Sequence, residues 1–415
     1  MNKNRIKVCV IGGGPAGMMC AGRAAENGCE VTLYEKNERV GRKLAITGKG
    51  RCNVTNNSDR ETFIENVQTN SRFLYAAYSS FTSQDTMEFF ESKGVPLKTE
   101  RGNRVFPQSD RAYDIVDAMR EYCTSNGVRI VYKKVDGLIC KDGEVKGIKV
   151  GKEECHYDRV AVCTGGMSYS KTGSDGDGYR FAREQGIGVI EPKPSLVPLE
   201  TEDSWTGSLA GLSLKNVRIT VHDRKENVEV YSDFGEMLFT HFGLSGPIVL
   251  SASSHIKEME KGRYTVKIDL KPALDEKTLD KRLLSDFGKN KNRNFSNCLS
   301  DLLPQKLIPV YVEQTGIPGG KKVNMITREE REKALKTMKG LECTVKAFRP
   351  IEEAIVTSGG IDVREIDPKT MMSKRVRNLY FAGEVIDADA YTGGFNLQIA
   401  FCTGNSAGMD MAREK

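Results

Sequence analysis

Three glycines and one acidic residue near the start of the chain have the types and spacing of a phosphate-binding turn. Gly12, Gly14 and Gly17 follow an apolar run, and Glu35 ends the next apolar run, CEVTLY. In such a turn the first glycine permits a tight bend, the second lets the backbone approach a pyrophosphate, and the third lets a helix pack closely on a strand. The helix N-terminus offers free N–H groups to phosphate, and the carboxylate accepts hydrogen bonds from ribose hydroxyls. The pattern predicts a dinucleotide site.

A cationic, glycine-rich loop, GRKLAITGKGRCNVTN (residues 41–56), follows this unit. It is not a Walker A loop, because Lys43 stands where that motif needs its first glycine and a glycine stands where it needs Ser or Thr. Since the loop comes directly after the acidic residue, we expect it to fold back over the same dinucleotide. Arg42 and Lys43 would then meet phosphate or ring oxygens. Lys49 and Arg51 fit either a cofactor contact or a solvated surface.

Few side chains are candidates for proton transfer or nucleophilic attack. His241 lies beside a Gly-Ser-Gly-Pro turn, where a hydrogen-bonded structural histidine is an alternative to a proton donor. Tyr169 and Tyr391 fit either proton donors or an aromatic wall. Ser245 lacks the final glycine of a nucleophile elbow, which excludes acyl transfer at this residue. Cys52 has no nearby cysteine, so we expect a small packed residue.

Three separated segments must position these residues. Residues 6–11 form a short apolar strand that leads through the glycine turn into a helix. Residues 128–166 alternate as strands joined by glycine turns and end in a buried strand before Thr164. Residues 378–412 contain a strand that stops at Gly383, a polar loop and a long apolar helix from about Phe395. Such a helix aims its N-terminal dipole at a ring that gains negative charge, which favours FAD as the dinucleotide.

Composition excludes several other classes of protein. The chain has 415 residues, 39% hydrophobic and 28% charged, as is typical of a folded globular protein. The net charge of +6 is small, and the basic run 277–339 is interleaved with acids, so we expect a solvated helical face. Eleven cysteines without a CxxC argue against zinc, a redox dithiol or disulfides. We expect no metal, no signal peptide, no membrane segment and a cytoplasmic location.

A set of long motifs in a fixed order resembles a known family. GGGPAGMMCA, GRKLAITGKGRCNVTN, RVFPQSDRA, CTGGMSYSKTGSDGDGY, LFTHFGLSGPIVL, AIVTSGGI and GEVIDADAYTGGFNLQIAF look like the signatures of bacterial FAD-dependent oxidoreductases. These are enzymes similar to aminoacetone oxidase and to the flavoprotein reductase of 3-dehydro bile acids, and the resemblance spans nearly the whole chain. Tyr391 and Lys49 depart from the small residues and the plainer glycine run that are frequent at these positions.

The resemblance implies an α/β fold with a Rossmann-type FAD-binding domain, an inserted β-barrel-like subdomain and a helical cap. The FAD domain would comprise residues 1–192 and 346–415, the β-rich subdomain 193–270, and the cap 271–345. A capping box at Thr327 predicts one helix start in the cap. The FAD contacts implied are Gly12, Gly14, Pro15, Ala16, Gly17, Glu35, Lys36, Arg42, Lys43, Asn53, Val135, Thr164, Gly165, Gly166, Gly383, Glu384, Asn396, Leu397 and Gln398.

The leading functional prediction is NAD(P)H-dependent reduction of a C=C bond in an enone, with bile-acid or steroid-like substrates suggested only by the resemblance. NAD(P)H would dock transiently, since no second glycine fingerprint occurs. We expect a small-molecule substrate, with no nucleic acid and no membrane as partner. Two alternatives stay open: oxidation of a small amine such as aminoacetone with release of hydrogen peroxide, and an RNA-binding flavoprotein that uses the Lys-rich insert. FAD kept only as a structural element is a further possibility.

Overall fold

The computed structural model describes residues 5–413, which form two compact units. Unit 1 combines the chain up to Ser195 with the chain from Ile351 onward, and unit 2 comprises Leu196–Pro350. No helix within residues 5–413 is long and apolar enough to cross a membrane.

Unit 1 is built on a five-stranded parallel sheet in the order β19-β10-β1-β2-β6. The central strands are apolar and buried because helices and loops cover both faces of such a sheet. The strand bounds are β1 (Lys7–Ile11), β2 (Glu30–Tyr34), β6 (Arg129–Val131), β10 (Arg159–Val162) and β19 (Leu379–Phe381).

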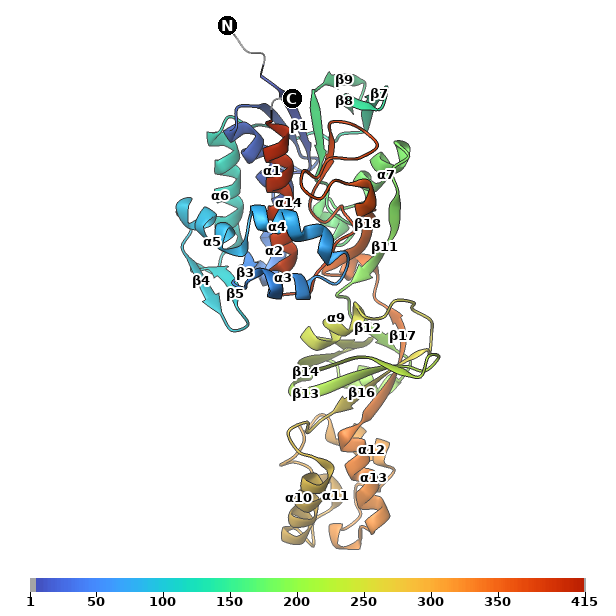
Figure 1. Cartoon of the computed structure of the whole chain (residues 1–415). Coiled ribbons are helices and arrows are strands. Elements are labelled where there is room, and N and C mark those ends of the chain that lie inside the picture. Colours follow the sequence, from blue (N-terminus) through green and yellow to red (C-terminus); the bar gives the residue numbers. More distant parts are fainter. Residues whose placement is uncertain (1–4, 414–415) are drawn as a thin grey trace. The chain divides into compact units, whose positions relative to one another are not determined.

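Helices α1 (Pro15–Glu26), α6 (Ala112–Ser125) and α14 (Phe395–Met411) pack beside one another at this sheet (Figure 1). Small residues set the spacing of α1 and α14, since a Cβ atom on Gly404 would lie 2.4 Å from the carbonyl oxygen of Ala16. The start of α1 therefore packs against the middle of α14. Helix α1 begins directly after β1, at the carboxyl ends of the parallel strands, where ligands bind in folds of this type.

Three small sheets complete unit 1. They are the sheet β3-β5-β4, the antiparallel meander β7-β8-β9 and the pair β11-β18. Their bounds are β3 (Thr55–Asn56), β4 (Leu97–Glu100), β5 (Arg104–Pro107), β7 (Gly137–Lys141), β8 (Glu144–Val150), β9 (Glu153–His156), β11 (Val189–Ser195) and β18 (Val356–Ile361). The remaining helices and 3-10 turns are α2 (Arg42–Gly50), α3 (Arg60–Asn66), η1 (Ser71–Leu74), α4 (Tyr75–Ser80), α5 (Ser83–Ser92), η2 (Ser170–Thr172), α7 (Asp177–Glu184), η4 (Ile351–Glu353) and η5 (Val363–Glu365).

Unit 2 is a closed six-stranded barrel in the order β12-β15-β14-β13-β16-β17, with its own apolar core. The strands are β12 (Leu199–Thr201), β13 (Ser213–Asp223), β14 (Val228–Thr240), β15 (Gly243–Ser245), β16 (Tyr264–Asp269) and β17 (Leu341–Phe348). The helices are α8 (Ser204–Ser208), α9 (Pro247–Ser253), α10 (Glu276–Lys289), α11 (Phe295–Cys298), α12 (Ile308–Thr315), η3 (Val323–Met325) and α13 (Arg328–Lys339).

The predicted fold class is confirmed: the chain has a Rossmann-type domain, a closed barrel and a helical segment. The predicted capping box is also confirmed, because the Thr327 side chain accepts from the Glu330 N–H and the Glu330 carboxylate accepts from the Thr327 N–H. One detail differs from the expected order of elements. The barrel closes through β17, which follows the helices in the chain, so α10 to α13 are an insertion between β16 and β17.

Candidate functional site

A cavity of about 760 Å³ lies in unit 1. Its walls come from the turn between β1 and α1, the loop after β10, the loop between β19 and α14, and the segment from Gly41 to Asn53. The chain thus brings the three glycine-containing segments and the cationic loop to one place, at the carboxyl ends of the parallel strands.

The glycine turn has the conformation that its spacing predicts. Gly12 has a φ of +106°, and a Cβ atom there would lie 2.4 Å from the carbonyl oxygen of Cys163. A Cβ on Gly17 would lie 1.8 Å from the Gly12 oxygen, so this position holds α1 close to β1. Gly14 lines the cavity, and a Cβ there would meet no protein atom within 4 Å. The lack of a side chain at Gly14 therefore leaves open space that a ligand can occupy, and it does not serve the packing of other protein atoms.

Glu35 is buried at the end of β2 and its carboxylate is fixed in place. Oε2 accepts from the Gly13 N–H at 2.9 Å, and Oε1 accepts from the backbone N–H and the side-chain amide of Asn37 at 2.8 and 2.6 Å. A carboxylate has about four acceptor positions, so one position on Oε2 stays available to a ribose hydroxyl. The predicted contact of Glu35 with ribose stays a prediction.

A second helix N-terminus meets the same cavity. Gly394 is the N-cap of α14, has a φ of +101° and provides no side-chain cap. A Cβ atom on Gly394 would lie 2.3 Å from the backbone of Thr55, so glycine is needed for α14 to begin against β3. The first N–H groups of α1 and α14 are thus both left for ligand atoms, because an uncapped helix start has unsatisfied donors.

Two buried polar atoms of the cavity wall also lack partners. The Oδ1 atom of Asn53 and the Oγ1 atom of Thr164 form no hydrogen bond to any described residue. Buried polar groups without partners are rare in folded proteins and indicate a site that a ligand completes. Together with the open space at Gly14 and the two uncapped helices, these residues fit FAD. Its pyrophosphate and ring oxygens would accept from the helix N–H groups and the Thr164 hydroxyl, and its N–H or hydroxyl groups would donate to Oδ1 of Asn53.

Lys43 is the centre of a polar cluster inside the cavity. Its Nζ lies 2.6 Å from Oε2 of Glu384 and donates to Oγ of Ser168, also at 2.6 Å. Oε1 of Glu384 accepts from Ser168 and from the Thr357 N–H, both at 3.0 Å. The predicted cofactor residues Lys43 and Glu384 are therefore paired with each other. Sequence reasoning did not single out Ser168 or Thr357, although both stand in motifs that carried the resemblance.

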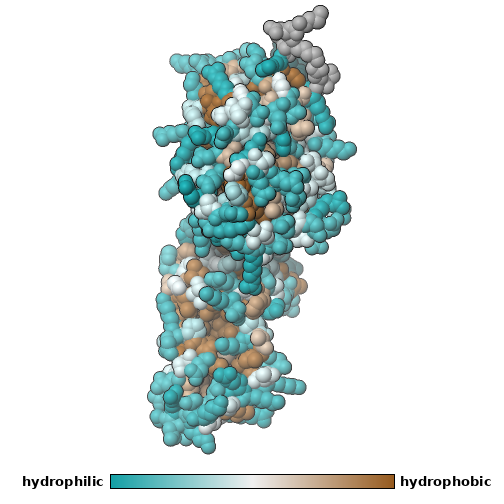
Figure 2. Space-filling view, turned by 90° about the vertical axis from the view of Figure 1, so that its left-hand side faces the viewer, coloured by the Kyte–Doolittle hydropathy of each residue, from teal (hydrophilic) through white to brown (hydrophobic). Residues whose placement is uncertain are grey.

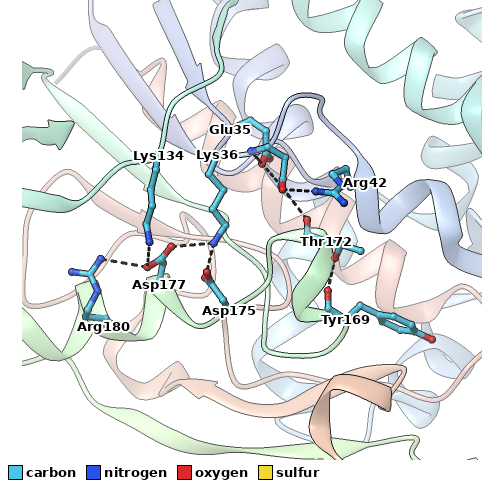
Figure 3. Close-up of polar contacts among 10 residues, drawn as sticks. Glu35, Lys36, Arg42, Lys134, Tyr169, Thr172, Asp175, Asp177 and Arg180 are labelled. Carbon is cyan, nitrogen blue, oxygen red and sulfur yellow. Dashed lines mark hydrogen bonds and ion pairs between the residues drawn. The ribbon is translucent and has the colours of Figure 1, made fainter. Parts of the chain in front are cut away.

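The neighbouring cations have different partners, which Figure 3 shows. Arg42 donates to Oδ1 of Asn37 at 2.7 Å. Lys36 pairs with Asp175 and Asp177 at 2.5 and 3.0 Å. Burial raises the pKa of Asp177, but the hydrogen bond and charge of Lys36 outweigh it and hold that pKa below its usual range. This network fixes the loop before α7 against the end of β2.

Lys49 and Arg51, for which the sequence left a cofactor contact and a solvated surface as alternatives, both line the cavity. Lys49 is exposed and has a φ of +58°. Arg51 pairs with Glu100 and Asp110, and its guanidinium lies 4.2 Å from the centre of the Phe106 ring. Arg51 thus belongs to an ion-pair network.

The remaining predicted cofactor residues divide into two groups. Gln398 is fully buried, where its Oε1 accepts from Thr55 and Thr86 and its amide donates to the Phe81 oxygen. Gly166 packs against Thr357 and Glu384, since a Cβ there would lie 2.4 Å from Oγ1 of Thr357. Gln398, Gly166 and Gly17 do not line the cavity but pack against the segments that form its wall. The others line the cavity directly: Pro15, Ala16, Val135, Gly165, Gly383, Asn396 and Leu397, with the residues described above.

Of the three predicted proton donors, Tyr169 lines the cavity. It has a left-handed backbone (φ 51°), which is uncommon for an aromatic residue, and its carbonyl accepts from the N–H and hydroxyl of Thr172 at 2.7 and 2.8 Å (Figure 3). Burial raises the pKa of Tyr169. Tyr391 is half-buried and adjoins the lining segment 392–394. His241 lies exposed in unit 2, with its ring against Phe242.

The thiols have a structural role. Cys52 is fully buried, as expected, and burial raises its pKa to about 12. All eleven cysteines are free thiols. Among residues 5–413, no group of three His, Cys, Asp or Glu side chains is gathered in a way that could hold a metal ion.

The fold and the cavity define a Rossmann-type, dinucleotide-binding flavoprotein. The chain belongs to the HI0933-like family, since the model of the HI0933-like protein Rossmann domain matches residues 6–410.

Named relatives cover nearly the whole chain. A ribosomal RNA dihydrouridine synthase of Haemophilus influenzae is 29% identical over 98% of this chain and 98% of its own length. A 3-dehydro-bile acid delta(4,6)-reductase of Clostridium scindens is 29% identical over 97% of this chain and 98% of its own length. A solved structure of a flavocytochrome c3 fumarate reductase in its open conformation has a TM-score of 0.52 at 17% identity, covering 99% of this chain and 78% of that one, which supports the fold alone. The protein is an FAD-dependent oxidoreductase.

Proposed function

We propose that this flavoenzyme uses NAD(P)H to reduce a C=C bond conjugated to a carbonyl group, and that the bond is C5=C6 of uracil in RNA. The names of the rRNA dihydrouridine synthase and the bile-acid reductase support the reduction of a conjugated C=C bond. Dihydrouridine differs from uridine by two hydrogens across C5=C6, which is conjugated to the C4 carbonyl, and a 3-dehydro bile acid with delta-4,6 bonds is a conjugated ketone. The sequence led us to expect a small molecule rather than a nucleic acid, so the substrate proposed here replaces that expectation.

The observation that carries the choice of RNA is the charge of the cavity wall. Eight cationic and three acidic side chains line it. Within residues 5–413, the lining residues Arg42, Lys49 and Arg104 form no ion pair, and each is exposed. The pyrophosphate of FAD carries about two negative charges. Additional cations at the mouth of the cavity favour a substrate with phosphates of its own.

The net reaction adds one hydride and one proton across the C=C bond while NAD(P)H becomes NAD(P)+. When bound, FAD supplies the redox chemistry between the nicotinamide and the substrate. The chain must bind and orient the reactants, exclude water and supply the proton. We assign the proton to the Tyr169 hydroxyl, because this residue lines the cavity and burial keeps the phenol neutral at physiological pH. Lys43, held by Glu384 and Ser168, keeps a positive charge fixed beside it, 5.8 Å from the ring centre.

The test uses the FAD-loaded protein without oxygen. Unmodified ribosomal RNA transcribed in vitro is incubated with NADH or NADPH, digested to nucleosides and examined by mass spectrometry for dihydrouridine. The proposal expects dihydrouridine that depends on both the protein and the reduced nicotinamide. RNA that stays unchanged while NAD(P)H reduces the flavin would contradict the choice of RNA.

A planar enone of steroid or bile-acid type is the second candidate. The bile-acid reductase supports it, since its identity to this chain is as high as that of the RNA-modifying relative. Saturation of a 3-keto-4-ene steroid, measured in the same anaerobic assay, would favour this substrate if RNA is not modified. Oxygen uptake with an amine such as aminoacetone, without NAD(P)H, would instead favour an oxidase.

A further inference from the structure

The helical insertion of unit 2 ends in a cluster of exposed cations that the cavity does not use. Lys289 is the last residue of α10, Lys291 and Arg293 follow it, and Lys322 stands just before η3. We call these four residues the cationic tip. Figure 2 shows hydrophilic side chains over most of the end of unit 2 that Figure 1 assigns to α10–α13.

Backbone hydrogen bonds bring the two segments of the cationic tip together. The Phe295 N–H donates to the Lys321 oxygen at 2.8 Å, and the Val323 N–H donates to the Arg293 oxygen at 3.1 Å. Asn294 and Lys322 pair as an antiparallel bridge. The four cations are therefore neighbours by the fold, although about thirty residues separate the two segments in sequence.

The charge of the tip is not compensated locally. None of its four cations forms an ion pair with any residue that the structure describes. Three acidic residues of α10 and α13 are already paired with other cations. Asp286 pairs with Arg282 at 2.8 Å, Glu330 with Lys321 at 2.6 Å, and Asp280 with Arg331 at 2.7 Å.

We propose that the cationic tip binds the phosphate backbone of RNA. This inference rests on the proposed function, since RNA is the substrate named there. The sequence KNKNRN (residues 289–294) alternates cations with asparagines, which together offer donors to phosphate and sugar oxygens. Contacts of this kind fix the register of the nucleic acid without reading its sequence, and they release counterions, so the binding depends steeply on salt.

The experiment compares the FAD-loaded wild-type protein with two variants of equal charge change. The test variant is K289Q/K291Q/R293Q/K322Q. The matched control is K141Q/K146Q/K149Q/K152Q, which removes four cations from the meander of unit 1. A third variant, K289R/K291R/R293K/K322R, keeps the charge of the tip. The affinity for a folded ribosomal RNA fragment is measured at several KCl concentrations, together with FAD content and flavin reduction by NAD(P)H.

Each lost phosphate contact lowers the slope of log affinity against log salt by about 0.7 to 0.9. We expect the test variant, which lacks four cations, to lose about 2.8 to 3.6 from that slope and at least about tenfold in affinity at low salt. The control and the charge-retaining variant should keep both quantities, and FAD content and flavin reduction should be unchanged in all three.

The outcomes separate this inference from the proposed function. If the wild type forms dihydrouridine but the test variant binds RNA like the control, the tip is not the contact and the inference is wrong. If the wild type binds RNA through the tip but leaves uridine unreduced, the proposed function fails and the inference stands. Absence of RNA binding by the wild type at low salt overturns the inference.

Discussion

Lys43 Nζ lies 2.6 Å from Oε2 of Glu384, and this pair joins the cationic loop near the start of the chain to the loop that precedes the last helix. Both side chains are about one fifth exposed and both line the cavity. The pair links two of the segments that enclose the cofactor space, so a change at either residue should affect the binding of FAD more than the fold of unit 1.

Lys43→Ala should therefore weaken FAD retention. A hydrogen bond to a charged group contributes about 1.5–3 kcal/mol, which corresponds to about a tenfold to hundredfold weaker affinity. Flavin content after gel filtration and a fluorescence titration of the apoprotein with FAD measure this. Lys49→Ala, at an exposed lining position, is the control and should retain more FAD. If Lys43→Ala retains full flavin occupancy, the cationic loop does not bind the cofactor and is only a solvated surface.

Two glycines of the same turn should respond differently to alanine. Gly14→Ala places its Cβ in open cavity space, so it should reduce FAD binding without changing the thermal stability of the apoprotein. Gly17→Ala places its Cβ 1.8 Å from the Gly12 oxygen and should destabilise the fold by about 1–3 kcal/mol or more. Thermal unfolding of both apoproteins, with FAD titrations, measures the difference. Equal loss of stability in the two variants would contradict the assignment of Gly14 to the ligand.

Tyr169→Phe should keep FAD and its reduction by NAD(P)H but slow reduction of the second substrate. General acid catalysis contributes about 10²–10⁴-fold, so a loss of at least about a hundredfold is expected. Because burial raises the pKa of Tyr169, the wild-type phenol stays protonated across the neutral range, and the rate should fall only in strongly alkaline buffer. Single-turnover rates against pH test this. An unchanged rate in Tyr169→Phe would exclude this phenol as the proton donor, and Tyr391, which adjoins the cavity lining, would be the next candidate.

Asp389 should make unit 1 sensitive to pH. Its carboxyl is buried, Oδ2 accepts from Ser195 at 2.8 Å, and Oδ1 has no partner among the described residues. Burial, with the charge of Glu384, raises the pKa of Asp389. A raised pKa means that the protonated form stabilises the fold at low pH and that this stability is lost as pH rises through the folded-state pKa.

Asp389→Asn should therefore raise the midpoint of thermal unfolding at pH 7, and the gain should shrink as the pH approaches the ordinary aspartate range near about 4. Differential scanning calorimetry at several pH values checks this, with the exposed Asp142→Asn as the control. A lower midpoint for Asp389→Asn at every pH would show that the ionised carboxylate is the stabilising form.

The nucleotide fold could be predicted from the sequence because its signals are local. The order of strand, glycine turn, helix and acidic residue is set by neighbours in the chain, and β1, α1 and β2 form where the pattern predicts them. The barrel was harder, since its closing strand β17 follows a helical insertion and pairs with β12 and β16 across long sequence separations.

The contacts between residues of the site could not be predicted from local sequence patterns either. Lys43 and Glu384 are far apart in the chain, and nothing in the spacing of either motif indicates that they pair. The family resemblance implied that both Leu397 and Gln398 contact the cofactor, and of the two Leu397 lines the cavity. On a helix, however, adjacent positions point about 100° apart, and the Gln398 amide is directed into the core, where Thr55 and Thr86 donate to it.

In the reaction that we propose, NAD(P)H reduces the bound flavin and the reduced protein then passes the electrons to uracil in RNA. Anaerobic stopped-flow mixing tests it most directly, by following the flavin absorbance near about 450 nm. We expect NADH or NADPH to bleach this band and unmodified ribosomal RNA to restore it as dihydrouridine forms. A band that NAD(P)H does not bleach, or one that returns only when oxygen is admitted, would exclude the proposed reaction.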